Sequence, residues 1–547
     1  MTKSITTNTL SDSVERITST EGSVKIWSGW QKFLFRVSFI FFIAISIPNS
    51  PEWYKHVFAI DWTNLHYRDL YDIARFGSGI NFFGSTIFGS SLNGYANWII
   101  TLVVALAAGA VWTLIDKRRS VPAKNYETLF YWLRAIVRYR AAIGIIGFGF
   151  TKLLPVQMPY PSEGLLNTDF GDFTAQKIYW LSIGIVPWYQ VFAGIVEIGA
   201  GTLLLFRKTT LLGAVLLFGA LGDIVYVNFA YDGGVHVYSS YFVLLSAFLI
   251  IPYIPHLYNL LIAEKPTRLE FFYPSLPTPW KYARYAVKAL TLIIFLGVFY
   301  YLQLVNFWYD PYKQPSVKGV SALRGYYDVT EFRINGKDIP YSPTDTVRWQ
   351  EATFEKWTSL TYKVNKPVPL DLSNGGGDPQ RDINRTFELT GTAGGRRVFH
   401  YLPDTVNNVL YLQDKYKAQP DRRNVTAGVG GDGGRNNTEA EKRIEIPERK
   451  SGIYADNWIS DEAWKNIGDE VKKIDPRAAS TRRDREFAQA GKKFDKRNRM
   501  VLKFQTTDGK RVVLEGLDEN QDSIYVVLNK IDRDYTLSQS TLVAGKY

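Results

Sequence analysis

Two carboxylic acids lie within segments that are otherwise apolar, and they are the first residues in this sequence that could do chemistry. Glu197 lies between Gly194 and Gly201, and Asp223 lies in the next apolar segment, one helical turn before Tyr226. An ionisable side chain inside a membrane costs about 2.5–3.5 kcal/mol on insertion scales, so each indicates a function or a specific partner. The two carboxylates could share a proton, or each could accept hydrogen bonds that hold neighbouring helices together.

A denser polar group follows, because Asn228, Asp232 and His236 fall within nine residues around a tight turn. Lys152, at the end of an earlier apolar segment, is expected at the same end of the molecule. Histidine titrates near neutral pH and aspartate can fix its tautomer, as in a catalytic or ligand-binding cluster. The alternative is a hydrogen-bonded turn that satisfies helix ends. The candidate ligand-binding or proton-handling residues are Glu197, Asp223, Tyr226, Asn228, Asp232, His236 and Lys152.

Composition excludes several chemistries and leaves the catalytic residues unassigned. The chain has no cysteine, which removes disulfides, thiolate metal sites and iron–sulfur clusters, and we expect no metal site. Its five histidines are dispersed, and no two fall in the middle of apolar segments, which argues against a haem held by two histidines. The last apolar segment has no mid-helix lysine for a Schiff base, since Lys288 lies near its beginning. That argues against a rhodopsin.

The elements that must position these residues are membrane helices. The chain has 547 residues and a net charge of +12. Its mean hydropathy of −0.11 averages two unlike halves, because long apolar runs dominate up to about Asn306 and polar sequence follows. A span needs about 20 predominantly apolar residues. Seven segments qualify, at residues 33–47, 97–115, 131–153, 187–206, 209–230, 235–253 and 284–305.

Basic residues give the bundle an orientation. Loops and helix ends on one face carry thirteen Lys or Arg residues and those on the other carry five. Because basic loops resist translocation, we expect a bacterial inner-membrane protein with a cytoplasmic N-terminus and a periplasmic C-terminal domain. In the first exported loop, Arg68, Asp72 and Arg75 lie on one helical face. They predict ion pairs within that helix, or an interfacial helix over the outer mouth of the bundle.

The C-terminal half changes to period-two alternation, which is typical of half-buried strands. The turn dipeptides Asn335-Gly336 and Asp508-Gly509 lie between such runs. Nine or ten strands predict a closed or nearly closed antiparallel barrel or sandwich, similar to lipocalin-like domains, whose interior is either a ligand pocket or packed. Residues 417–450 predict a flexible polar insert, and residues 454–495 a charged helical element. The strand candidates are 327–334, 346–354, 360–364, 385–389, 396–401, 408–413, 500–506, 511–516 and 523–531.

Three stretches resemble one family. They are residues 149–153, 194–209 and 228–232, within a match that covers 134–261. They are similar to the DoxX-like membrane proteins. This resemblance implies that the matched region forms a compact four-helix bundle. The best-known members are membrane subunits of thiosulfate:quinone oxidoreductase. In this chain His236 stands where the family resemblance places a lysine.

These observations predict a membrane all-α bundle of about seven helices with a four-helix core, followed by an exported all-β domain. The expected regions are a cytoplasmic tail at 1–32, two helices at 33–130 with an exported loop at 48–96, a core at 131–262, a cytoplasmic loop and last helix at 263–309, and the β domain at 310–547 with a polar insert at about 417–499.

No complete catalytic constellation is present, which favours an accessory or scaffold subunit of a cell-envelope complex. Its partners would be the lipid bilayer and other proteins, reached through the exported domain, with no nucleic-acid partner. The alternative is a redox or quinone-associated subunit that binds a small lipophilic ligand. Quinone is the cofactor that this alternative implies, and Glu197 and Asp223 would relay protons to it.

Overall fold

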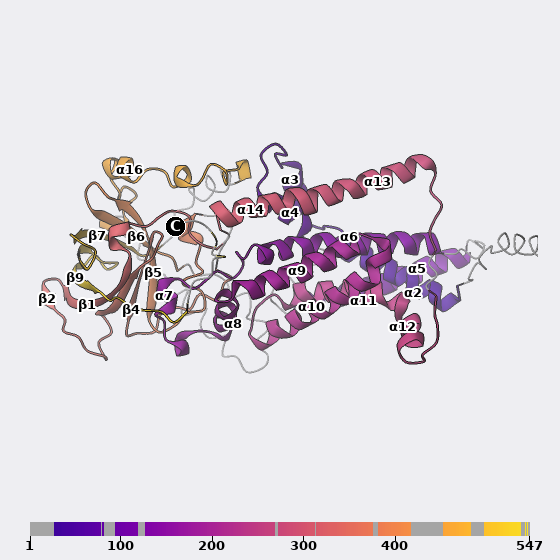
Figure 1. Cartoon of the computed structure of the whole chain (residues 1–547), viewed down its shortest axis with the longest axis horizontal. Helices are drawn as coiled ribbons and strands as arrows, with labels where there is room; N and C mark the ends of the chain where they lie inside the picture. The colour runs from indigo at the N-terminus through magenta and orange to yellow at the C-terminus, as the bar shows by residue number, and fades with distance from the viewer. Residues whose placement is uncertain are drawn as a thin grey trace, which may run out of the picture.

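The protein consists of a helical bundle and a β-barrel that lie end to end, with the barrel at the end of the bundle opposite the start of helix α2 (Figure 1). The computed structural model describes residues 27–77, 79–80, 82, 93–118, 126–268, 272–311, 313–375, 381–416, 452–482, 497–537, 542 and 544. The predicted polar insert at 417–450 lies outside the described residues.

Long helices occupy all seven segments that the sequence predicted. By length and apolar composition, five of the described helices can cross a membrane, or six if the bent pair α8–α9 is one span. Helix α6 is not among the five, because it carries Arg134, Arg138, Arg140 and Lys152. The helices are α2 Gly29–Ser46, α5 Asn93–Arg118, α6 Glu127–Leu153, α9 Pro187–Leu204, α10 Thr210–Ala230, α11 His236–Ile250 and the run α13 Thr278–Leu292, η4 Ile293–Val298 and α14 Phe299–Tyr309.

The sequence did not predict the bend between α8 (Ala175–Gly184) and α9, which changes the helix direction by 91°. Pro187 begins α9, and the residue before a proline is driven out of the helical conformation. Gly184 ends α8 against the preceding loop, where an added Cβ would lie 2.5 Å from the Pro159 carbonyl oxygen. The bend therefore combines a helix break with a close backbone contact.

Helices α6, α9, α10 and α11 pack into a four-helix bundle, with α2 against α5 and α6. The glycines of α9 lie in close contact with α6. An added Cβ on Gly194 would lie 2.3 Å from the Leu153 amide nitrogen and 2.7 Å from the Gly149 carbonyl oxygen. One added on Gly201 would lie 3.1 Å from the Ala142 carbonyl oxygen. Small residues let the two backbones touch, as is common between membrane helices.

The C-terminal half forms a closed antiparallel barrel of eight strands, which is the barrel alternative of the prediction with fewer strands than the nine or ten expected. Strand order follows the chain, and β1 pairs with both β3 and β9 to close the sheet, with β2 as a two-residue extension. Asn335 and Gly336 take positive φ values of 51° and 77° in the tight turn after β1, as expected for that dipeptide. The strands are β1 Gly325–Ile334, β2 Lys337–Asp338, β3 Trp349–Phe354, β4 Ser359–Val364, β5 Arg396–Asp404, β6 Val409–Asp414, β7 Arg499–Thr506, β8 Arg511–Leu517 and β9 Ser523–Lys530.

Large side chains fill the described barrel interior, which favours the packed alternative over the pocket. Tyr327, Phe354, Phe399 and Tyr401 are fully buried in one continuous core. Between Val329 and Glu331 a β-bulge shifts the register of β1, so that Phe332 also points inward.

One element prediction was wrong. Residues 385–389 form a turn rather than a strand, after the 3-10 helix η6 (Asp382–Asn384). In this segment Arg385 contacts Asp310 at the end of α14, and Glu388 contacts Lys415 after β6. Of the predicted charged helical element at 454–495, the described part contains helix α16 (Asp461–Ile467), which Gly468 ends with a positive φ of 70°, and the 3-10 helix η8 (Val471–Lys473). Residues 483–495 lie outside the described residues. Short helices complete the described chain: α3 Pro51–Phe58, α4 Tyr67–Ala74, α7 Glu163–Leu166 and α12 Ile254–Leu261.

Replacing Gly194 by Ala should destabilise the bundle by about 1–3 kcal/mol, because the new methyl group meets backbone atoms that cannot move aside. Gly199→Ala is the matched control on the same helix, since nothing lies within 4 Å of its added Cβ. Thermal unfolding of both variants in detergent measures the difference. Equal melting temperatures would show that the backbones are not in tight contact at Gly194.

Candidate functional site

Glu197 and Lys152 form an ion pair inside the bundle, between α9 and α6. Lys152 is 8% exposed and Glu197 is 2% exposed, so both charges are removed from solvent. The sequence had placed Lys152 near the Asn228–His236 turn instead. The Glu197 Oε2 atom is buried and has no hydrogen-bond partner among the described residues. The pair therefore leaves one acceptor position open to a proton donor.

Asp223 and Tyr226 do not join this pair. Both face outward from α10, and the Tyr226 side chain is 74% exposed. A carboxylate pair shared between Glu197 and Asp223 is therefore not formed, because Glu197 points into the α6–α9 interface while Asp223 points away from the bundle.

The turn between α10 and α11 is built mainly by Asn228. Its side chain donates to the Ile224 carbonyl oxygen (2.7 Å) and accepts from the Val235 amide (3.2 Å), which satisfies helix ends as the structural alternative expected. Asp232 is exposed and has a positive φ of 52°. His236 points inward instead, is 1% exposed, and contacts the Tyr95 hydroxyl at 3.3 Å from Nδ1. The predicted cluster is therefore not formed: Asn228 and Asp232 belong to the turn, whereas the His236 ring is buried in the bundle.

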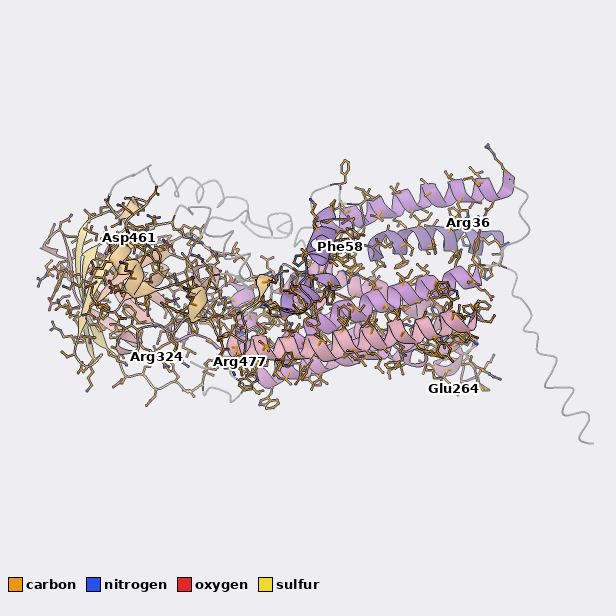
Figure 2. All side chains as sticks on the ribbon, turned by 90° about the horizontal axis from the view of Figure 1, so that it is seen from above. Arg36, Phe58, Glu264, Arg324, Asp461 and Arg477 are labelled. Carbon is orange, nitrogen blue, oxygen red and sulfur yellow. The ribbon has the colours of Figure 1, made fainter. Side chains whose placement is uncertain are left out.

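Two buried arginines of the bundle were not among the predicted site residues. Arg36, labelled in Figure 2, lies on α2. It pairs with Asp116 on α5 at 2.8 Å and also donates to the Tyr126 hydroxyl. Arg140 on α6 donates to the Ala74 carbonyl oxygen at 2.7 Å. The partners are 80 and 66 residues away in the sequence, so periodicity gives no signal for either contact.

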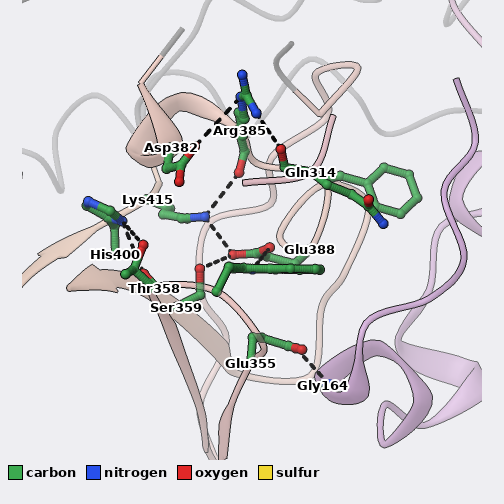
Figure 3. Close-up of polar contacts among 12 residues, drawn as sticks. Gly164, Gln314, Glu355, Thr358, Ser359, Asp382, Arg385, Glu388, His400 and Lys415 are labelled. Atoms are coloured by element: carbon green, nitrogen blue, oxygen red, sulfur yellow. Dashed lines mark hydrogen bonds and ion pairs between the residues drawn. The ribbon is translucent and has the colours of Figure 1, made fainter. Parts of the chain in front are cut away.

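The densest group of buried charges lies where the barrel meets the bundle (Figure 3). We call it the junction network. Its members are Asp310, Glu355, Asp382, Arg385, Glu388, Arg396, His400 and Lys415, each no more than 5% exposed.

A barrel carboxylate caps a helix of the bundle loop. Glu355, just after β3, accepts hydrogen bonds from the amides of Glu163 (3.1 Å) and Gly164 (2.9 Å) at the start of α7. Arg396 on β5 donates to the Gly164 carbonyl oxygen. Free amides at a helix start favour a negative group, so the contact joins the two parts by complementary charge.

Glu388 and Lys415 form the centre of the junction network. The Lys415 ammonium contacts Glu388 Oε1 at 2.6 Å and the Arg385 carbonyl oxygen at 3.1 Å. Ser359 and Trp357 donate to the same carboxylate at 2.5 and 2.9 Å. Every oxygen of Glu388 therefore has a donor, which is the condition under which a buried ion pair is tolerated.

Arg385 links the end of α14, the last long helix of the bundle, to the barrel. Its Nη2 contacts Asp310, directly after α14, at 2.7 Å, and its Nη1 donates to the Ser316 hydroxyl at 2.6 Å. Asp382, beside it, accepts from the amides of Ser316 and Val317. The chain that leaves the bundle is therefore held by charged groups within a few residues of α14.

A second group of charged contacts, outside the junction network, lies on the side of the bundle that carries α3 and α4. Arg482 contacts Asp72 at 2.8 Å and Asp69 at 3.5 Å. Asp72 also pairs with Arg68 within α4 at 3.0 Å, as the sequence predicted. Arg477 lies against Tyr309 at the end of α14, with a hydrogen bond of 2.7 Å (Figure 2). The loop between the first two long helices is therefore tied to the segment that follows α16.

Burial sets the protonation of several junction groups. It raises the pKa of the Glu355 carboxyl from its ordinary 4.5 to about 7, with a further increase from the Glu388 carboxylate. Burial, followed by the charge of Asp382, raises the pKa of Glu470 to about 7, and Glu470 accepts from the Asp382 amide at 2.8 Å. Burial and the Lys415 charge lower the pKa of His400 to about 3, so this imidazole is neutral at physiological pH.

The central groups of the junction network already have hydrogen-bond partners. Its central acid is saturated by donors, and its histidine is neutral and hydrogen-bonded to Thr358. Among the described residues, no group of three or more His, Asp or Glu is placed to hold a metal ion.

Comparisons of the chain with protein family models, with curated proteins and with solved structures return no match.

Glu197→Gln should destabilise the protein by about 3–5 kcal/mol, because it leaves the Lys152 ammonium buried without its counter-charge. The double variant Lys152→Met with Glu197→Gln should recover most of that loss. Thermal unfolding of the two single variants and the double variant measures the coupling. Additive losses in the double variant would contradict the ion pair.

The stability difference between the wild type and Glu355→Gln should shrink as the pH rises from 5 to 8. The folded-state pKa of Glu355 is raised, so its contribution is complete below about pH 4.5 and is lost as the pH rises through about 7. His400 acts in the opposite sense but is present in both proteins, so its effect cancels. Thermal unfolding across this pH range measures the difference, and a constant difference would contradict the raised pKa.

Proposed function

We propose that this protein is an integral membrane scaffold or accessory subunit of a bacterial cell-envelope complex. In this proposal the helices lie in the inner membrane, the N-terminus lies in the cytoplasm and the barrel stands on the periplasmic side. The DoxX-like resemblance of residues 134–261 belongs to the proposal.

The observation that carries the proposal is the junction network. A barrel joined by a mobile linker needs few contacts with the bundle. Here Glu355, Arg396 and Arg385 bury charges against the loop before α8 and the end of α14. Buried charges are costly unless their geometry is kept, so they favour one orientation of the barrel relative to the membrane. A fixed orientation is what a scaffold requires.

The barrel interior supports the same proposal. Its core is filled by aromatic and aliphatic side chains, with Trp349 stacked on Tyr362 at 3.9 Å between ring centres. A filled barrel interacts through its outer surface, so we place the protein partners there.

Arg385→Gln should reduce the recovery of protein partners while the chain still inserts into the membrane. The substitution removes the charge that pairs with Asp310 and so loosens the barrel. Arg333→Gln is the control, because Arg333 is an exposed arginine of the same barrel. The measurement is cross-linking in cells, purification in mild detergent and quantification of partners per chain. A wild-type protein without any partner at fixed stoichiometry would contradict the scaffold.

A quinone-associated role is the second candidate, and the open Glu197 Oε2 position favours it. A buried carboxylate with one free acceptor could receive a hydrogen bond from a hydroxyl or a reduced quinone. The purification above separates the two candidates. A co-purifying quinone, absent from the variant Lys152→Met with Glu197→Gln, would favour this second role over the scaffold.

A further inference from the structure

A cavity of about 650 Å³ opens at the end of the bundle opposite the barrel. It is lined by the starts of α2, α6 and α10 and by the end of α11, which meet at this end. Of the described residues that line it, three are arginines and one is a glutamate: Arg134, Arg138, Arg207 and Glu127. Its size lies within the usual range of small-ligand sites.

Aromatic groups and hydroxyls hold the three arginines in place. Arg134 donates to the Tyr253 hydroxyl at 3.1 Å, and the Arg207 guanidinium lies 4.6 Å above the Tyr273 ring. Arg138 reaches the Thr210 hydroxyl at 3.4 Å, and its buried Nε has no hydrogen-bond acceptor among the described residues. For Arg138 and Arg207, these contacts position the guanidinium group without neutralising its charge.

The three positive charges act on one another. Arg138 is surrounded by protein and lies within electrostatic range of both Arg134 and Arg207. Like charges that are partly shielded from water repel strongly, so an anion between them would stabilise the site. Arginine binds phosphate through paired N–H groups in one plane, and that geometry suits several guanidinium groups around one phosphate.

The walls and position of the cavity indicate the rest of the ligand. Apart from the charged residues its lining is largely apolar, including Trp27, Leu34, Phe130, Phe248 and Phe272. The cavity lies at the ends of apolar helices, where headgroups lie when such helices cross a bilayer. Basic pockets between membrane helices bind anionic lipid headgroups in this position.

We propose that this cavity binds an anionic glycerophospholipid, with its phosphate held by Arg138, Arg134 and Arg207 and its acyl chains against the aromatic wall. The site does not depend on the scaffold role. It differs from the Glu197–Lys152 pair, which lies towards the other end of α6 and carries no excess positive charge.

The test uses the full chain, purified in neutral detergent and titrated with phosphatidylglycerol, phosphatidylcholine or inorganic phosphate. Native mass spectrometry counts retained lipids, and thermal unfolding reports stabilisation. We expect one tightly retained phosphatidylglycerol, which raises the melting temperature, and no comparable effect from phosphatidylcholine. Arg138→Gln and, independently, Arg207→Gln should weaken this binding at least about tenfold, because each removes charged hydrogen bonds to the phosphate.

Lys281→Gln is the matched control, since it removes one positive charge on exposed α13, outside the residues that line the cavity. It should bind phosphatidylglycerol as the wild type does. Arg138→Lys keeps the charge but loses the planar fork, and it should bind with intermediate strength. Size-exclusion profiles check that each variant is folded.

Three results would overturn the proposal. The first is unchanged phosphatidylglycerol binding in both arginine variants. The second is phosphatidylcholine retained as tightly as phosphatidylglycerol, which would remove the role of negative charge. The third is stabilisation by free phosphate equal to that by the lipid, which would assign the site to a soluble anion.

Discussion

The burial of charge at the joint between barrel and bundle is the constraint on which the rest of the structure depends. Glu355 accepts hydrogen bonds from the amides of Glu163 and Gly164, and Arg385 pairs with Asp310 directly after α14. A charge in such a place is tolerated only while its partners stay in position. These contacts therefore favour one arrangement of the barrel, the loop before α8 and the end of α14.

Some buried charges of the bundle have counter-charges on neighbouring helices. Arg36 is paired with Asp116 and Lys152 with Glu197, whereas the buried Arg140 donates to the Ala74 carbonyl oxygen and lies over the Phe76 ring. Around the cavity at the end opposite the barrel, arginines exceed acids among the described lining residues. An anionic ligand would balance this excess of positive charge.

Much of the architecture could be predicted from the sequence, because the signals are local. Apolar length located the long helices, and period-two alternation with Asn335-Gly336 located the barrel strands. The predictions failed where burial was decided by distant segments. Residues 385–389 have an alternating pattern, yet they form a turn because their side chains serve the joint with the bundle instead of a sheet. The bend before Pro187 was not predicted, because an apolar run indicates a helix but does not indicate whether that helix continues straight from the preceding one.

The candidate site shows the same division. The sequence by itself determined that Glu197 is an acid within an apolar helix and that Asn228 belongs to a tight turn, since hydropathy and turn composition are properties of neighbouring residues. Only the tertiary structure decided that Glu197 faces Lys152 while Asp223 faces outward. The physical reason is that helix rotation is set by packing, here by the contact of Gly194 with the α6 backbone, and a rotation of half a turn exchanges buried for exposed side chains.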